Sequence, residues 1–213
     1  MGHILRSILF HLSHIFAFPA SVVLFRFRSY GVGNVPITGP VIIASNHTSI
    51  FDPPLIANGQ LRVLYYMAKS ELFKNPLFRA LIVSYGAFPV KRGEGDVKAM
   101  RTALNLLSKN RVVLIFPEGT RSKTGALGEG REGAGMIIYK ANALVVPTYI
   151  MNSNKILIPG KGFQLPKIEL RYGKPLDFSY LGGQKPSKKL YKNISQKIMN
   201  EIARLKSETD RDR

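Results

Sequence analysis

His47 and Asp52 stand five positions apart in the polar stretch 46–53, an imidazole followed by a carboxylate. A neutral imidazole accepts a proton near neutral pH, and a nearby carboxylate fixes its tautomer and stabilises the imidazolium that forms. The chain has no Gly-x-Ser-x-Gly nucleophile elbow, so direct activation of a substrate hydroxyl by His47 is the simplest chemistry. The alternative is structural, because an aspartate before Pro53 is also a good helix N-cap.

Two further polar clusters also follow apolar runs. One combines Lys69 with Lys91 and Arg92, and the other is the segment 118–121, which begins with Glu118 and ends with Arg121. Cations and a small loop that exposes amides suit a phosphate group. Glu118 could hold Arg121 in place or bind a substrate hydroxyl. The alternative for both clusters is solvated charge and an ordinary tight turn.

The elements that must position these clusters alternate between strands and helices. This alternation predicts an α/β fold, a mixed and largely parallel sheet flanked by helices on both faces. We expect strands at 41–44, 62–68, 86–92, 112–116, 144–150 and 168–172, and helices at 70–84, 96–110, 136–143 and 187–206. The last helix is amphipathic and is expected to pack on the sheet rather than lie on a membrane.

The N-terminal segment is apolar, with no charged residue between Arg6 and Arg26 when its histidines are neutral. As a helix it would reach about 28 Å, close to the roughly 30 Å of a bilayer core. Pro19 interrupts it, so a kinked or re-entrant pair of short helices fits as well as a full span. We expect residues 1–30 to form a membrane-attached helical segment, with a buried core helix as the alternative. The globular domain is expected to cover residues 36–213.

The net charge of +18 favours an anionic partner, which could be nucleic acid, an anionic membrane or a phosphorylated substrate. The usual nucleic-acid-binding motifs do not occur in the sequence. The chain also lacks cysteine, which excludes disulfides, a thiol nucleophile and thiolate metal sites.

Two motifs together resemble the glycerolipid acyltransferase family, and most nearly its bacterial 1-acyl-glycerol-3-phosphate acyltransferases. The first is the stretch 46–52, with four residues between His47 and Asp52, and the second is Phe-Pro-Glu-Gly-Thr-Arg-Ser at 116–122. The stretches 86–92 and 145–147 resemble the remaining two motifs of the family in its order. Lys91 departs from the pattern, which usually has an acidic residue before the arginine.

The resemblance implies transfer of a fatty acyl group from acyl-ACP or acyl-CoA to the 2-hydroxyl of 1-acyl-sn-glycerol-3-phosphate, which makes phosphatidic acid. It implies that His47 is the general base, that Asp52 orients it, and that neither a cofactor nor a metal is needed. Residues 36–213 would then be the acyltransferase domain, at the cytoplasmic face of the inner membrane among anionic lipids. The residues implied to bind the glycerol phosphate are Lys69, Arg92, Glu118, Gly119, Thr120 and Arg121.

Three alternatives stay open at this point. The acceptor could be another lysophospholipid or a lyso-aminolipid, because the stretch 86–92 matches its motif weakly. The same histidine and aspartate could serve a lipid hydrolase that uses water as the nucleophile. A basic membrane-bound protein could also simply bind anionic lipid or nucleic acid.

Overall fold

The fold is built on a seven-stranded sheet whose strands follow the order β1-β9-β6-β2-β5-β3-β4. The computed structural model describes residues 3–90 and 96–212. The strands are β1 (Arg28–Tyr30), β2 (Val41–Ser45), β3 (Leu64–Lys69), β4 (Ala87–Val90), β5 (Val112–Ile115), β6 (Leu144–Met151) and β9 (Glu169–Tyr172). Neighbouring strands pair in parallel except β6 and β9, which are antiparallel. The predicted mixed, largely parallel sheet is therefore confirmed.

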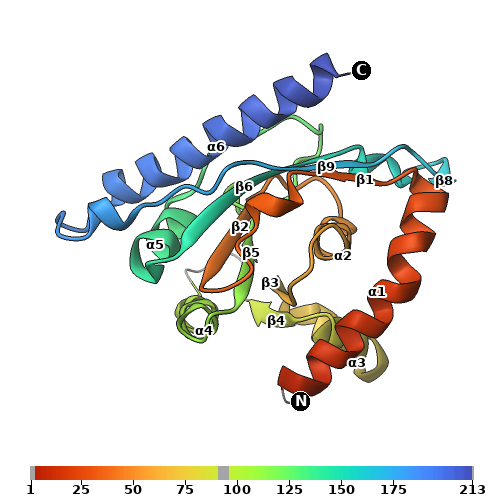
Figure 1. Cartoon of the computed structure of the whole chain (residues 1–213), viewed down its shortest axis with the longest axis horizontal. Helices are drawn as coiled ribbons and strands as arrows, with labels where there is room; N and C mark the ends of the chain where they lie inside the picture. The colour runs from red at the N-terminus through yellow and green to blue at the C-terminus, as the bar shows by residue number, and fades with distance from the viewer. Residues whose placement is uncertain (1–2, 91–95, 213) are drawn as a thin grey trace.

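Helices cover both faces of this sheet (Figure 1). The helices are α1 (His3–Phe25), α2 (Asp52–Asn58), α3 (Pro76–Ser84), α4 (Val97–Ser108), α5 (Glu132–Ala141) and α6 (Lys188–Arg211). Figure 1 shows α4, α5 and α6 on one face, and α1, α2 and α3 on the other. Because both faces are covered, central strands such as β2 and β5 are buried along their whole length and read as continuous apolar runs.

Short elements complete the chain. They are the 3₁₀ helices η1 (Val32–Asn34), η2 (Ser70–Phe73), η3 (Ser153–Lys155) and η4 (Ser179–Leu181), and the antiparallel pair β7 (Leu157–Ile158) and β8 (Gly162–Phe163). The sequence analysis did not predict β1, β7 or β8, because two or three residues are too few to show a period.

Helix α6 packs on the sheet, as expected from its apolar stripe. Ile194, Ile198 and Ile202 are buried on the face that contacts α5 and β6. The contact with α5 is close at Gly135, where an added Cβ would lie 1.9 Å from the carbonyl oxygen of Tyr191. Gly135 therefore lies at a helix crossing, and the prediction that α5 begins only at residue 136 was wrong. Two glycines that precede residue 136, Gly133 and Gly135, are inside the helix.

Helix α1 differs from the expectation in one respect. It is a single helix that continues through Pro19, so a pair of separate short helices, one of the two forms considered, is not seen. Its outer face is apolar and exposed, with Phe16 at 76% and Val23 at 77% relative exposure. On its inner side Phe10 belongs to the core, so α1 is buried on one side only. Within residues 3–90 and 96–212, no helix combines the length and apolarity needed to cross a membrane.

The predicted helix at 70–84 is divided in two. The 3₁₀ helix η2 ends at Phe73, and α3 begins at Pro76, with the Asn75 side chain accepting a hydrogen bond from the Phe78 amide. A proline has no amide hydrogen to continue a preceding helix, but it suits the first helical turn. Only part of the apolar face of this segment meets the core: Leu77 is 85% exposed and Leu81 is 53% exposed, whereas Ile82 is buried.

Candidate active site

The candidate site lies at one edge of the sheet because four neighbouring strands run in the same direction. Strands β2, β5, β3 and β4 are parallel, so their carboxyl ends meet at one edge. His47 follows β2, Glu118 follows β5 and Lys69 ends β3. The sequence could not prove that the polar clusters converge, but the strand order brings them to the same edge. Lys69 was grouped with Lys91 and Arg92 in the sequence, but these two residues lie outside the described residues.

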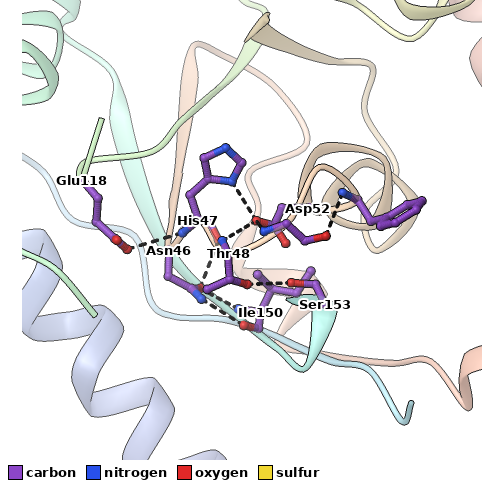
Figure 2. A network of polar contacts seen from close by, with 10 residues as sticks. Asn46, His47, Thr48, Asp52, Glu118, Ile150 and Ser153 are labelled. Carbon is purple, nitrogen blue, oxygen red and sulfur yellow. Dashed lines mark hydrogen bonds and ion pairs between the residues drawn. The ribbon is translucent and has the colours of Figure 1, made fainter. Parts of the chain in front are cut away.

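His47 and Asp52 form a buried pair. Nδ1 of His47 lies 2.7 Å from Oδ2 of Asp52, and the two residues are 6% and 0% exposed. The same oxygen of Asp52 accepts hydrogen bonds from the amides of Thr48 at 2.7 Å and Ser49 at 2.8 Å (Figure 2). Asp52 therefore fixes both the imidazole and the backbone of the turn that carries it.

The alternative role of Asp52 as a helix N-cap is not what the structure shows. Asp52 is the first residue of α2, and the N-cap position belongs to Phe51, whose side chain makes no capping hydrogen bond. The carboxylate instead bonds backward, to the two amides and the imidazole that precede it. An aspartate that closes a loop onto a histidine is suited to orient that histidine for proton transfer.

The ring of Phe116 lies flat against the imidazole of His47. The ring centroids are 3.8 Å apart and the planes are 12° from parallel. The aromatic ring limits rotation of the imidazole, and its π face is attractive to the imidazolium form. Asp52 and Phe116 thus hold the imidazole from its edge and from its face.

The backbone of His47 is fixed by the segment 116–122. Oε1 of Glu118 accepts a hydrogen bond from the His47 amide at 3.4 Å, and the His47 carbonyl accepts one from the Ser122 amide at 2.7 Å. Glu118 is buried and also accepts a hydrogen bond from the Gly128 amide. Burial raises the pKa of the Glu118 carboxyl above its ordinary value, and the two backbone hydrogen bonds act in the opposite direction. The carboxylate of Glu118 is thus engaged with the protein backbone.

Asn46 anchors the start of the motif to the neighbouring strand. Its side-chain amide donates to the Ile150 carbonyl at 3.0 Å, and its side-chain oxygen accepts from the Ile150 amide at 2.9 Å. Thr48 adds a contact between its hydroxyl and that of Ser153 at 2.8 Å. Figure 2 shows these contacts on the side of the turn away from the imidazole. The turn is therefore tied to β6 as well as to the segment 116–122.

The imidazole of His47 borders an apolar pocket of about 390 Å³. This volume is within the range of small-molecule sites. The lining comes from β3, β4, β5, α4, α5 and the segment 116–120: His47, Met67, Val90, Asp96, Val97, Ala99, Met100, Leu114, Ile115, Phe116, Pro117, Gly119, Thr120, Arg131, Gly133, Ala134, Met136 and Ile137. A reacting group beside His47 would thus lie next to a space suited to an apolar chain. In the described part of the chain, no three His, Asp or Glu residues gather into a metal site.

A family model described as Acyltransferase matches residues 26–151, more than half of the chain. The chain belongs to the acyltransferase family. The resemblance inferred from the two motifs is therefore confirmed. The matched region contains the whole of the His47 turn, the segment 116–122 and the strands between them.

Several relatives of this chain share the name 1-acyl-sn-glycerol-3-phosphate acyltransferase. The 1-acyl-sn-glycerol-3-phosphate acyltransferase of Bacillus subtilis is 30% identical over 189 residues, which cover 86% of this chain and 89% of that protein. The chloroplastic 1-acyl-sn-glycerol-3-phosphate acyltransferase LPAT1 of Arabidopsis thaliana is 32% identical over 148 residues, 66% of this chain. The matched part spans only 41% of LPAT1 and 42% of a similar chloroplastic protein of Brassica napus.

A solved structure shares the fold of this acyltransferase. The crystal structure of the 1-acyl-sn-glycerophosphate (LPA) acyltransferase PlsC from Thermotoga maritima superposes with a TM-score of 0.76 at 26% identity. The superposition covers 94% of this chain and 81% of that one. The mixed α/β sheet flanked by helices is therefore common to both proteins.

The residues that the sequence assigned to phosphate binding are not all at the pocket. Gly119 and Thr120 line it, whereas Glu118 is buried and is not part of the lining. Lys69 is exposed, with its amine 4.0 Å from a Glu71 carboxylate oxygen, and it does not belong to the lining. Arg121 is also exposed and outside the lining. Arg92 lies outside the described residues.

Three residues of this acyltransferase have contacts that sequence reasoning did not assign. Phe116 and Asn46 are inside the recognised motifs, so their positions were visible but their contacts with His47 and Ile150 were not. Arg131 also lines the pocket, although it stands nine residues beyond the end of the second motif at Ser122. The available signal for Arg131 was a single arginine in a stretch rich in glycine.

Proposed function

We propose that this protein transfers a fatty acyl group from acyl-ACP or acyl-CoA to the 2-hydroxyl of 1-acyl-sn-glycerol-3-phosphate, making phosphatidic acid. The observation that carries the proposal is the buried pair of His47 and Asp52 beside an apolar pocket. Membership of the acyltransferase family and the shared name of its relatives support the same reaction.

The tautomer of His47 follows from its contact with Asp52. A proton on Nδ1 is donated to the carboxylate, which leaves Nε2 to accept a proton. Figure 2 draws the second ring nitrogen pointing away from Asp52. In the proposed step, Nε2 takes the proton of the 2-hydroxyl while the hydroxyl oxygen attacks the thioester carbonyl carbon. The carbon–sulfur bond then breaks, and the leaving thiolate takes a proton, so that ester and free thiol are formed.

Asp52 contributes to this step through charge as well as geometry. The imidazolium that forms is buried, and an unpaired buried charge is unfavourable. The carboxylate of Asp52 and the π face of Phe116 both stabilise it. Glu118 is a positioning residue in this scheme, because its carboxylate bonds to the His47 amide.

The two substrates would occupy the pocket and its rim. The acyl chain of the thioester suits the apolar wall formed by α4, α5 and β5. Gly119 and Thr120, at the rim beside His47, are suited to contact the glycerol phosphate. Lys69, Arg92 and Arg121 would add attraction for anionic substrates within a net charge of +18.

The activity test uses detergent-purified protein and measures thiol release from an acyl thioester, with and without 1-acyl-sn-glycerol-3-phosphate. We expect release that depends on acceptor in the wild type and its loss in His47→Ala, with the circular dichroism spectrum unchanged. Equal release without acceptor would identify a hydrolase. Activity with a lyso-aminolipid or another lysophospholipid alone would replace the proposed acceptor, and full activity of His47→Ala would contradict the mechanism.

We also propose that α1 attaches the protein to the cytoplasmic face of the inner membrane, where acyl-ACP or acyl-CoA and a membrane-held acceptor meet. The support is an apolar surface made by two helices. Ile15, Phe16 and Val23 of α1 are exposed, and so are Leu77 and Leu81 of α3. The two helices contact each other and lie together on one face of the sheet (Figure 1). Exposed apolar area of this kind favours insertion at a lipid interface.

The attachment test is sedimentation with vesicles that contain phosphatidylglycerol. We expect Phe16→Glu and Val23→Glu to release most of the protein, because each places a charge in the inserted surface. Tyr180→Glu is the matched control. Tyr180 is 63% exposed, lies in η4 and contacts Lys197 of α6, and α6 covers the face of the sheet opposite α1 (Figure 1). Equal binding of all four proteins would contradict the proposal.

A further inference from the structure

One cation at the rim of the pocket is not used by the mechanism above. Arg131 lines the pocket together with His47, Gly119 and Thr120. Its backbone is held from two sides: its amide donates to the Pro117 carbonyl at 2.7 Å, and its carbonyl accepts from the Ser195 hydroxyl at 2.7 Å. The position of Arg131 beside the catalytic turn is therefore fixed by the motif segment and by α6.

The guanidinium of Arg131 has no counterion within 4 Å among residues 3–90 and 96–212. Glu129, two residues earlier, is paired with Lys192 at 2.6 Å. Glu118 bonds to the backbone amides of His47 and Gly128. Asp96, which lines the same pocket, accepts a hydrogen bond from the Ala99 amide. Glu129 is close enough for the charge of Arg131 to help lower its pKa, but its direct partner is Lys192. Within the described residues no carboxylate pairs directly with Arg131, so its guanidinium can bind another anion.

The side chain of Arg131 runs against the backbone of the second motif. A Cβ added at Gly119 would lie 3.4 Å from Cγ of Arg131, and Gly119 has a positive φ of 73°. The stem of Arg131 therefore lies at van der Waals distance from the position of Gly119. Both residues belong to the pocket lining, which also includes Thr120 and His47.

We propose that Arg131 binds the phosphate monoester of the acceptor and so sets the acceptor class of this enzyme. A guanidinium presents two parallel N–H donors that match a phosphate group, and such charge-assisted hydrogen bonds are strong. The proposal rests on the proposed function, since it assigns a residue to the acceptor of that reaction. It gives to Arg131 the role that the motif alone suggested for Arg121, which is exposed and outside the pocket lining.

The test compares two acceptors that differ only in the phosphate, 1-acyl-sn-glycerol-3-phosphate and 1-monoacylglycerol with the same chain. The proteins are the wild type, Arg131→Ala, Arg131→Lys, Arg121→Ala as the rival position, and Arg101→Ala as the control. Arg101 is an exposed arginine of α4 outside the pocket lining. We expect Arg131→Ala to raise KM for the phosphorylated acceptor roughly 10- to 100-fold. The ratio of kcat/KM for the phosphorylated acceptor to kcat/KM for monoacylglycerol should fall by the same factor. Arg131→Lys should give intermediate values of both quantities. Arg101→Ala should change both quantities less than about threefold. Arg121→Ala should change them less than Arg131→Ala does, since Arg121 is outside the pocket lining.

A second measurement covers the case in which monoacylglycerol turns over too slowly to measure. Free sn-glycerol 3-phosphate is added as an inhibitor, and its inhibition constant should rise in Arg131→Ala by the same roughly 10- to 100-fold as KM. The acceptor ratio and the inhibition constant do not depend on the concentration of active protein. A variant that is partly unfolded would therefore not change either quantity.

Three outcomes would overturn the assignment. The first is a rise in KM for the acyl-CoA or acyl-ACP donor instead of the acceptor, which would place a donor phosphate at Arg131. The second is an equal loss of kcat/KM for both acceptors, which would make the residue structural. The third is a larger effect at Arg121. By contrast, a wild type that releases no thiol in response to any acceptor would refute the proposed function itself.

Discussion

Asp52→Asn separates the charge of the aspartate from its hydrogen bonds. Oδ2 of Asp52 accepts three hydrogen bonds, from the imidazole of His47 and from the amides of Thr48 and Ser49. Within the described residues Oδ1 has no hydrogen-bond partner. An asparagine can therefore keep its carbonyl oxygen at the position of Oδ2 and place its amide where Oδ1 lies. The three contacts are retained, but the negative charge opposite the imidazolium is lost.

The size of the effect follows from the burial of the pair. Breaking a buried ion pair costs about 3 to 5 kcal/mol, and each 1.4 kcal/mol or so is tenfold in rate. Because the imidazolium forms only during proton transfer, this loss falls on the reaction. We expect kcat of Asp52→Asn to fall roughly 100- to 5,000-fold, with stability reduced by about 1 kcal/mol.

Asp52→Ala gives the complementary result. It removes the acceptor of two backbone amides, and each buried donor left unsatisfied costs about 1 to 3 kcal/mol. We expect a loss of kcat at least as large as in the asparagine variant, together with a loss of about 2 to 6 kcal/mol in the free energy of unfolding. Urea unfolding and acceptor-dependent thiol release measure the two effects separately.

A double variant tests whether Asp52 acts through His47. Adding Asp52→Asn to His47→Ala should lower the residual rate no further, since the carboxylate would have no imidazolium to stabilise. The reasoning is refuted if Asp52→Asn keeps kcat within about threefold of the wild type. It is also refuted if the asparagine variant lowers kcat only in proportion to a loss of folded protein.

Three other perturbations test the supports of the site. Phe116→Leu should lower kcat roughly 2- to 30-fold, because the ring stacked on His47 stabilises the imidazolium; an unchanged kcat would show that the stack is only packing. Gly135→Ala should lower the free energy of unfolding by about 1 to 3 kcal/mol or more, because its Cβ would meet the α6 main chain. Gly133→Ala is the control, because a Cβ added there has no heavy atom within 4 Å. It should leave the thermal unfolding midpoint unchanged or raise it. Burial raises the pKa of Glu118, so the folded protein keeps this proton to a higher pH than the unfolded chain. The ordinary pKa of a glutamate carboxyl is 4.5. As pH rises from this value through the higher pKa of the folded state, the wild type should lose stability relative to Glu118→Gln. Unfolding midpoints of the two proteins that run in parallel across this range would contradict the expected loss.

The central strands were predictable because their burial requires continuous apolar runs, which are visible in the sequence. β2 and β5 lie between neighbours on both sides and are covered on both faces, so every position is apolar. Helix α4 was equally clear, with Asp96 accepting a hydrogen bond from the Ala99 amide at its start. These elements are specified by local composition and spacing.

Helices α3 and α5 show where local pattern fails. Several apolar residues of α3, such as Leu77 and Leu81, have helical spacing but are exposed, because spacing specifies a common face and not what covers it. The glycines of α5 signal a loop in isolation. Gly135 is helical because α6 approaches too closely for any side chain. Such contacts between distant segments leave no local trace in composition.

The sequence by itself determined the longer strands, the two motifs and hence the chemistry of a histidine beside an aspartate. Two residues five positions apart in one turn can bond to each other whatever the rest of the chain does, so His47 and Asp52 were identifiable from spacing. The tertiary structure alone decided which distant residues join them. The parallel order of β2 and β5 brings Phe116 and Glu118 to His47, and the path of the chain through α5 brings Arg131 to the same pocket while Arg121 stays outside it. These contacts depend on strand order and helix packing, which no local spacing encodes.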